Sequence, residues 1–244
     1  MQLNNLFPIP VGWFDHEEGL TESEKKFLLN LDEKPNEGNT TSSYRYLLRD
    51  KKLSNLNQWI NECVEKYFDE IYKPKFDVEP YITQSWANYT KKGQWHHKHR
   101  HPNSFLSGVY YIQADQTKDK IFFFHPKQYH TIKIHPPRDW NLYNSESWWF
   151  NVKTGGMVLF PSSLEHWVAP VEADQTRVSL SFNTFLKGYV GDDDSLTGLH
   201  LGGDATPKNM LKPKKQLAPG KSGNILHEVN ICLLYTSDAA DEFS

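Results

Sequence analysis

The densest concentration of potential metal ligands in the chain lies in one short segment. Residues 94–102 read Gln-Trp-His-His-Lys-His-Arg-His-Pro, so four histidines fall within six residues. His166 follows much later, and Arg177 comes soon after it. Imidazole is the commonest protein ligand for transition metals, and a guanidinium can grip a carboxylate at two points. This combination predicts a mononuclear metal site that also holds a carboxylate-bearing small molecule.

The strand periodicity of the histidine segment suggests which members bind the metal. Side chains alternate along a strand, so we expect His97, His99 and His101 to share one face while His96 points away. Two histidines two residues apart can converge on one ion, and a neighbouring strand must supply the third ligand. We therefore predict His99, His101 and His166 as the ligands. His97 has three open roles: it could replace His99 or His101, form hydrogen bonds behind the ligands, or bind substrate.

Arg177 is the predicted carboxylate-binding residue. It opens the segment Arg-Val-Ser-Leu-Ser, in which Arg177, Ser179 and Ser181 face the same way on a strand. An inward guanidinium needs an anionic partner, and the sequence offers no evident internal one. A ligand carboxylate is then the expected partner. The alternative is an exposed ion pair with Asp174 or Glu172.

A tyrosine pair lies in the predicted core strand at 105–112. Such tyrosines are usually packing residues. One hydroxyl, preferably that of Tyr111 rather than Tyr110, could share the ligand carboxylate with Arg177. The predicted ligand-binding set is therefore Arg177, Tyr111 and Ser179.

The elements that must position these residues are mostly strands. A short strand is expected at 6–14. Thr21 and Glu24 form a possible capping box before a first helix, and an apolar stripe predicts a second helix over about 52–72, with a polar loop at 38–43 between them. About eight β-rich runs follow, which favours a sandwich or jelly roll braced on one face by the two helices. The runs are 81–89, 105–113, 120–124, 131–134, 148–152, 157–160, 167–171 and 177–186.

Composition excludes several classes of protein. The net charge is −3 and the sequence pI is about 6.4, which argues against a general nucleic-acid binder. No run of about 18 apolar residues and no signal-peptide pattern occur, so we expect no membrane association and a cytoplasmic location. The only two cysteines, Cys63 and Cys232, indicate neither a disulfide framework nor a zinc knuckle.

The sequence patterns typical of helices and strands become sparse toward the C-terminus. We predict one domain over residues 1–187 that includes the N-terminal helices, and a loop-rich extension over 188–232. Residues 233–244 have the character of a translated read-through rather than of native sequence, so we expect them to contribute nothing to the fold.

Several blocks in order resemble one enzyme family. These are His-Arg-His-Pro-Asn-Ser at 99–104 leading into Ser-Gly-Val-Tyr-Tyr at 107–111, Leu-Phe-Pro-Ser at 159–162 leading to His166, and Arg-Val-Ser at 177–179 with Asn183. They resemble the 2-oxoglutarate- and Fe(II)-dependent oxygenases common in marine phages and bacteria. The resemblance covers about residues 6–200 in layout and is strongest over 86–186.

The resemblance implies a mainly β protein with a double-stranded β-helix (jelly-roll or cupin-like) core. It also implies Fe(II) at His99, His101 and His166, and the distal carboxylate of the co-substrate 2-oxoglutarate at Arg177. The expected reaction is hydroxylation of a primary substrate with release of succinate and CO2. A phage-infected bacterial cell is one expected setting. The sequence leaves the primary substrate and the oligomeric state open.

One departure from the usual pattern bears on function. Most such oxygenases use two histidines and one carboxylate, whereas His101 stands here where Asp or Glu is usual. A three-histidine site resembles thiol and diketone dioxygenases instead. The alternatives are therefore a cupin-like three-histidine metalloenzyme that does not use 2-oxoglutarate, or a non-catalytic jelly-roll binding module.

Overall fold

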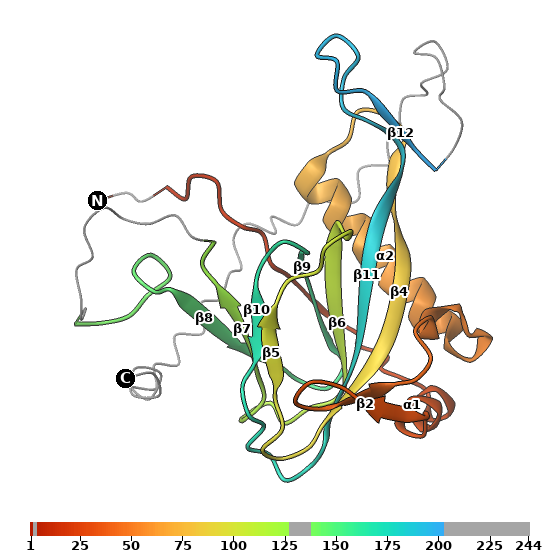
Figure 1. The fold of residues 1–244 in the computed structure, drawn as a ribbon, viewed down its shortest axis with the longest axis vertical. Helices are drawn as coiled ribbons and strands as arrows, with labels where there is room; N and C mark the ends of the chain where they lie inside the picture. Colours follow the sequence, from red (N-terminus) through yellow and green to blue (C-terminus); the bar gives the residue numbers. More distant parts are fainter. Residues whose placement is uncertain (2–3, 127–137, 203–244) are drawn as a thin grey trace.

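The computed structural model of the protein describes residue 1, residues 4–126 and residues 138–202. Strands dominate it (Figure 1), and the two helices and two short 3-10 turns come early in the chain, between residues 22 and 72. The elements in chain order are β1 Gly12–Asp15, α1 Glu22–Leu29, β2 Glu33–Pro35, β3 Thr40–Ser42, η1 Leu47–Arg49, η2 Lys51–Leu53, α2 Ser54–Tyr72, β4 Val78–Thr90, β5 His96–His99, β6 Leu106–Gln113, β7 Lys120–Phe124, β8 Ser147–Asn151, β9 Gly156–Pro161, β10 His166–Val168, β11 Arg177–Val190 and β12 Leu199–Leu201.

Two antiparallel sheets form the body of the molecule. The larger has the order β1-β9-β6-β11-β4-β3-β2, with β12 paired to β11, and the smaller has the order β5-β10-β7-β8. Between β4 and β11 most consecutive strands lie in different sheets, as β4 and β5 or β9 and β10 do, so the chain crosses repeatedly between the layers. This is the arrangement of a double-stranded β-helix, and it confirms the predicted fold class.

Both predicted helices are present, and they cover the outer face of the larger sheet. Thr21 Oγ1 accepts a hydrogen bond from the Glu24 backbone N–H at 3.2 Å, and Glu24 Oε2 accepts one from the Thr21 N–H at 3.0 Å, so the capping box forms. The apolar stripe of α2 is buried at Leu56, Ile60 and Val64. These side chains pack in one cluster with residues of β4, β6 and β11, which anchors the sheet that carries Arg177.

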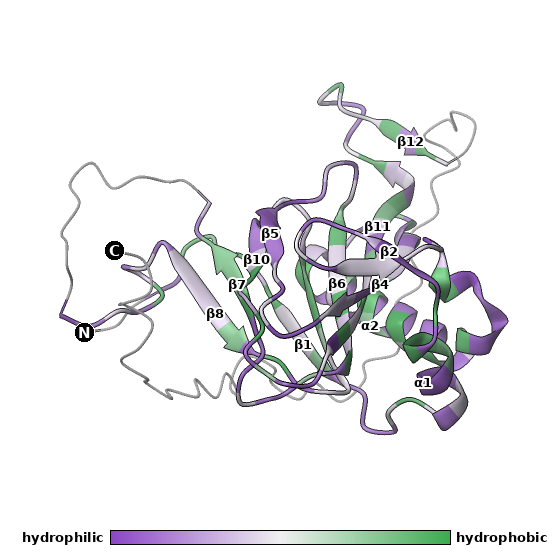
Figure 2. Cartoon of the chain, turned by 60° about the horizontal axis from the view of Figure 1, so that its bottom comes forward, coloured by the Kyte–Doolittle hydropathy of each residue, from purple (hydrophilic) through white to green (hydrophobic). Residues whose placement is uncertain are grey.

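Alternation along β6 sends its two tyrosines to opposite sides of the larger sheet. Tyr110 belongs to the cluster beneath the helices, while Tyr111 belongs to a second cluster between the sheets with Ile121, Val158 and Phe160. Figure 2 shows β7 as hydrophobic and β5 as hydrophilic. The space between the sheets is therefore apolar on one side and rich in histidine on the other.

Several sequence-based boundaries need correction. The polar segment 38–43 contains β3, which pairs with β4 through Thr40 and Thr41, because cross-strand pairing overrides its loop-like composition. The opening strand begins only at Gly12, after Pro8 and Pro10. β11 continues to Val190 and pairs there with β12. The expected strand at 131–134 lies outside the described residues.

Two further observations concern cysteine and membranes. Cys63 is buried in α2 as a free thiol, and Cys232 lies outside the described residues. Within the part of the chain that the structure describes, neither helix combines the length and apolar composition that crossing a membrane requires.

Candidate metal centre

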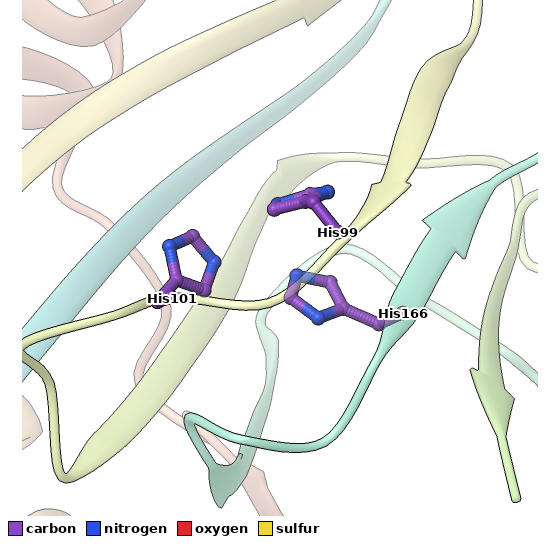
Figure 3. A group of neighbouring side chains, drawn as sticks. All are labelled: His99, His101 and His166. Carbon is purple, nitrogen blue, oxygen red and sulfur yellow. The ribbon is translucent and has the colours of Figure 1, made fainter. Parts of the chain in front are cut away.

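The pairing of β5 with β10 brings the predicted ligands together. His99 lies directly opposite His166 in the register of the two strands. His101 follows the end of β5, where its backbone N–H donates to the Ser162 carbonyl at 3.0 Å. The nitrogen atoms offered by the three imidazoles all lie within 4.8 Å of one another, and Figure 3 shows the rings converging from β5, the segment after it and β10.

Backbone hydrogen bonds set the orientation of two of these rings. His99 Nδ1 lies 2.7 Å from the His97 carbonyl, and His166 Nδ1 lies 3.1 Å from the Leu164 carbonyl. A carbonyl can only accept, so each Nδ1 carries the proton and each Nε2 keeps its lone pair. This is the usual arrangement of a metal-binding histidine, whose second nitrogen donates to a fixed acceptor.

The surroundings keep the three imidazoles neutral. Burial, followed by the charge on neighbouring histidines, lowers the pKa of His101 to about 4 and that of His166 well below its ordinary value. Burial also lowers the pKa of His99. A metal ion binds the neutral ring, so the site needs little proton release before it can bind a cation.

His96 does not point away from the site, contrary to the alternation argument. A β-bulge separates the pairs His166–His99 and Val168–His96, so β5 has one more residue than β10 over this stretch. The extra residue breaks the two-residue alternation. The His96 ring consequently lies 4.5 Å from the His99 ring and lines the same cavity, and burial with the neighbouring imidazoles lowers its pKa to about 3.

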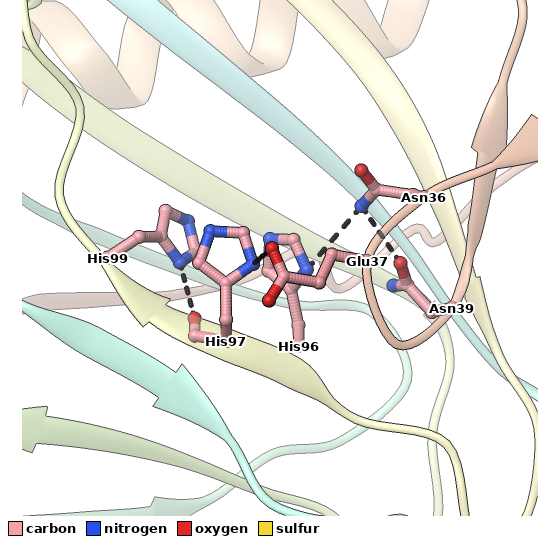
Figure 4. A network of polar contacts seen from close by, with 6 residues as sticks. All are labelled: Asn36, Glu37, Asn39, His96, His97 and His99. Carbon is pink, nitrogen blue, oxygen red and sulfur yellow. Dashed lines mark hydrogen bonds and ion pairs between the residues drawn. The ribbon is translucent and has the colours of Figure 1, made fainter.

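The loop between β2 and β3 contacts the remaining histidine (Figure 4). Glu37 Oε2 lies 3.5 Å from Nδ1 of His97, and Asn36 Nδ2 lies 3.5 Å from Nδ1 of His96. His97 thus has a carboxylate partner outside the group of three histidines. Asn39, 5% exposed, lines the cavity from the same loop.

Arg177 is buried inside the molecule, at the start of β11. It is 4% exposed, and its Nη1 donates to the Lys120 carbonyl at 3.0 Å. The alternative of an exposed ion pair with Asp174 or Glu172 is wrong, because Arg177 is buried; the Asp174 carboxylate accepts from Lys92 Nζ at 2.7 Å instead. The cavity lined by the three predicted ligands is also lined by Arg177.

Tyr111, and not Tyr110, faces Arg177. The Arg177 guanidinium carbon lies 5.7 Å from the centre of the Tyr111 ring, whereas Tyr110 contacts His16 on the helix side. The Tyr111 hydroxyl and the Arg177 Nε are both buried without a hydrogen-bond partner. Ser179, 3% exposed, also lines this cavity. Two unsatisfied donors at one end of a cavity are suited to a ligand carboxylate.

The sequence reasoning missed two polar residues near this end. Asp119, 2% exposed, interacts electrostatically with Arg177 and Tyr111, and burial raises its pKa. It lies just before β7, and only the packing of one sheet against the other brings it close. Asn88 on β4 lines the cavity and has a buried, unpartnered Oδ1. The even spacing of Trp86, Asn88 and Thr90 was a usable signal, since the three share one face of a strand.

Comparison with known proteins gives one family match. Residues 84–183 match the model of the family described as "Putative 2OG-Fe(II) oxygenase". The matched stretch runs from β4 to β11 and contains His99, His101, His166 and Arg177. No curated protein matches the chain.

Solved structures give more remote likenesses. An oxidoreductase of the 2OG-Fe(II) oxygenase family from Burkholderia pseudomallei has a TM-score of 0.48 and 16% identity, covering 66% of this chain and 74% of that one. HygX from Streptomyces hygroscopicus, with nickel, 2-oxoglutarate and hygromycin B bound, has a TM-score of 0.49 and 10% identity, covering 72% and 82%. A Pseudomonas putida prolyl-4-hydroxylase has a TM-score of 0.47 and 11% identity, covering 72% and 92%.

The family match and the geometry of the site thus concern the same stretch of chain. Residues 84–183, which hold the three converging histidines and the buried arginine, match the model of the 2OG-Fe(II) oxygenase family.

Proposed function

We propose that the protein is an Fe(II)- and 2-oxoglutarate-dependent dioxygenase that hydroxylates a primary substrate and releases succinate and CO2. The observation that carries the proposal is one cavity with a three-imidazole cluster and, at its far end, a buried arginine and tyrosine with unsatisfied donors. This arrangement suits a ligand that binds the metal with one end and places a carboxylate at Arg177 with the other.

In this proposal His99, His101 and His166 hold the metal. The donor set fits iron, because imidazole nitrogen is a common ligand of non-haem Fe(II) and two of the rings are already oriented by backbone carbonyls. Bound Fe(II) supplies oxygen activation, which couples oxidation of the 2-oxo acid to oxidation of a C–H bond.

Arg177 and Tyr111 bind the distal carboxylate of 2-oxoglutarate in this proposal, and Ser179 lies beside them. The Lys120 carbonyl holds one side of the guanidinium through Nη1, which leaves the buried Nε–H without a protein acceptor. Charge-assisted hydrogen bonds from a buried guanidinium are strong, because little water competes with them. Arg177 therefore selects a dicarboxylic 2-oxo acid over a shorter one.

Apolar side chains line the rest of the cavity and limit the access of water. Val109, Ile121 and Phe160 contribute from β6, β7 and β9. A dry wall strengthens the electrostatic interactions of the bound carboxylate and protects reactive chemistry from side reactions.

A three-histidine metalloenzyme that does not use 2-oxoglutarate is the second candidate. The metal-ligand group found among residues 4–126 and 138–202 contains imidazoles and no carboxylate, which favours this alternative. The buried donors of Arg177 and Tyr111 favour the first candidate.

The test separates the two candidates. Metal-free protein is loaded anaerobically with Fe(II), and 2-oxoglutarate binding is measured by calorimetry. Succinate release is then measured in air. We expect metal-dependent binding and slow succinate release even without primary substrate. Metal binding with no affinity for 2-oxoglutarate would favour the three-histidine alternative, and failure to bind any divalent metal would contradict both.

The proposal extends to the setting of the enzyme. We propose that the catalytic domain is residues 1–187, followed by an extension over 188–232 and a non-native stretch over 233–244. We also propose a cytoplasmic location and a small-molecule co-substrate as the obligatory partner. Succinate detection in a screen of metabolites, with each supplied as the candidate substrate, identifies the primary substrate as the compound that stimulates turnover.

A further inference from the structure

Arg45, which follows β3, carries a charge that no acidic side chain of the described residues balances. Its Nη1 donates to Thr41 Oγ1 at 2.6 Å. Among residues 4–126 and 138–202, no carboxylate forms an ion pair with it. The side chain is partly buried, and burial lowers its pKa, although a guanidinium stays charged. A partly desolvated cation is costly without an anion, so this position needs a physical reason.

The pairing of β3 with β4 places the Arg45 guanidinium on the cavity side of the larger sheet. Thr41 lies opposite Asn88 in this pairing, and Asn88 lines the cavity. Residues directly opposite each other in an antiparallel pair share one face. Thr41 therefore faces the cavity side, and the guanidinium that contacts its hydroxyl lies there too.

The backbone after β3 gives the same orientation independently. Tyr46 forms a parallel bridge with Ser85 of β4, and the Ser85 N–H donates to the Arg45 carbonyl at 2.9 Å. Ser85 Oγ accepts from the Leu48 N–H at 2.9 Å, and Leu48 belongs to the cluster beneath the helices. Ser85 and Tyr46 thus face the helix side. Alternation along the chain then turns Arg45 to the opposite side, toward the cavity.

The neighbour of Ser85 connects this position with the metal ligands. Trp86 lines the cavity, and its ring lies 6.0 Å from the ring of His101. Arg45 is therefore hydrogen-bonded through its backbone to the residue that precedes this wall. A molecule held at Arg45 can extend along the Trp86 ring toward the metal ligands.

Arg45 and Arg177 cannot share one small anion. β4 lies between β3 and β11, so two strand spacings, roughly 10 Å, separate the strand that holds Thr41 from the strand of Arg177. Arg177 also points to the other sheet, where its Nη1 donates to the Lys120 carbonyl. The two cations thus suit two different ligands.

We propose that Arg45 binds an anionic group of the primary substrate, and that this substrate is a small acid with a carboxylate or a phosphate. The assignment rests on the proposed function and deepens it, because it names the class of the primary substrate. A guanidinium offers parallel N–H donors that match the oxygen atoms of either anion. Trp86 supplies a flat surface for the carbon skeleton beside the metal ligands.

The first experiment measures the charge preference with paired compounds. Each carboxylic acid is supplied beside its primary amide, and each phosphate monoester beside its parent alcohol, to the Fe(II)-loaded full chain with 2-oxoglutarate. The readout is succinate release above the level without added compound. We expect acids of one of the two kinds to stimulate release, and their neutral counterparts to stimulate it at least about tenfold less. Equal stimulation by the neutral counterparts, or none by any acid, would overturn the assignment.

The second experiment assigns the preference to Arg45. We expect Arg45→Gln to raise KM for a stimulating acid by about 10- to 100-fold, the effect of losing a hydrogen bond to a charged group. The KM of the neutral counterpart should not change. Arg45→Lys should give an intermediate KM, since lysine keeps the charge and a donor for Thr41 but lacks the planar guanidinium. An unchanged KM for the acid in both variants would contradict the role of Arg45.

A matched control comes from the same segment. Arg49 lies over the Tyr46 ring at 4.5 Å and donates to the Thr83 carbonyl at 3.4 Å, so Arg49→Gln removes an equal charge and should leave KM unchanged. Thermal melting and 2-oxoglutarate affinity are measured for every variant. Arg45→Lys replaces Arg45→Gln if the glutamine variant does not fold. Loss of 2-oxoglutarate affinity in a folded Arg45 variant would mean that Arg45 serves the co-substrate, and the assignment would be wrong.

The outcome for the native protein separates this assignment from the proposed function. If the Fe(II)-loaded protein neither binds 2-oxoglutarate nor releases succinate, the proposed function fails and the assignment fails with it. If succinate is released and acids have no advantage over their neutral counterparts, only the role of Arg45 fails.

Discussion

The candidate metal centre consists of three imidazoles, where a carboxylate is the usual third ligand of this class of site. Three neutral donors leave more positive charge on the metal than two imidazoles and one carboxylate do. The buried position of the rings and their lowered pKa values suit this composition, since burial disfavours charged ligands as well as charged imidazoles.

Substitution of His101 tests the ligand set. We expect His101→Ala to lower Co(II) affinity by roughly 100-fold or more, since losing a ligand should cost at least as much as losing its outer hydrogen-bond partner. His101→Asp should retain affinity within about tenfold, because it restores the common triad. Visible absorption of bound Co(II) gives the measurement, and Arg100→Ala is the control. Full affinity in His101→Ala would mean that His96 or His97 is the third ligand.

Substitution of Arg177 tests carboxylate recognition. Arg177→Ala should weaken 2-oxoglutarate binding by about 10- to 100-fold and leave Co(II) affinity unchanged, because the guanidinium contacts no metal ligand. The 2-oxoglutarate affinity of Arg177→Lys should lie between those of the native protein and Arg177→Ala, since lysine keeps the charge and lacks the planar guanidinium. Calorimetry measures the affinities for 2-oxoglutarate and for Co(II), and Lys92→Ala is the control. Loss of metal binding in Arg177→Ala would instead indicate a structural role.

At the scale of elements, the decisive feature is how the β2–β3 loop fits against β5. The Trp95 N–H donates to the Gly38 carbonyl at 3.1 Å, and the loop supplies the partners of His96 and His97. Gly38 has φ of +81°, and a Cβ there would lie 2.5 Å from the Trp95 carbonyl oxygen. Glycine is therefore required both by the backbone conformation and by the close approach to β5.

A matched pair of glycine substitutions tests this fit. Gly93 has nearly the same backbone conformation, φ of +79°, but a Cβ there would meet nothing within 4 Å. Gly93→Ala should lower the free energy of unfolding by about 1–2 kcal/mol through backbone strain alone. Gly38→Ala should cost more, because Trp95 must also move, and it should weaken Co(II) binding. Denaturant melts measure the free energy of unfolding, and visible absorption measures Co(II) binding. Equal effects of the two substitutions would contradict a positioning role for the loop.

At the scale of the whole molecule, two packed layers hold the site. One cluster joins the helices to the larger sheet, and the other fills the space between the sheets. Among the described residues, no member of either cluster comes later in the chain than Phe182. The part of β11 that pairs with β12, residues 188–190, therefore follows the core residues in the chain.

This distribution of the core predicts the effect of truncation. A chain ending at residue 202 should retain its thermal midpoint within a few degrees and its affinities for Co(II) and 2-oxoglutarate. A chain ending at residue 176 should fail to fold, because it loses the strand with the most extensive pairing in the larger sheet. Thermal melting and calorimetry compare the stability and the ligand affinities of the two truncated chains with those of the full chain. Loss of binding at residue 202 would show that later residues contribute to the site.

The residue types of the candidate site and most of the helices and strands could be predicted from the chain alone. Histidine spacing, the buried position of Arg177, the capping box and the apolar stripe of α2 all depend on local periodicity, which is readable from one chain. The packed fold was needed to show that His96 lines the cavity, that β3 is a strand, and that Asp119 lies close to Arg177. Each of these depends on a bulge, a register or the packing of one sheet on another. Such pairings join residues far apart in the chain, so local sequence does not specify them.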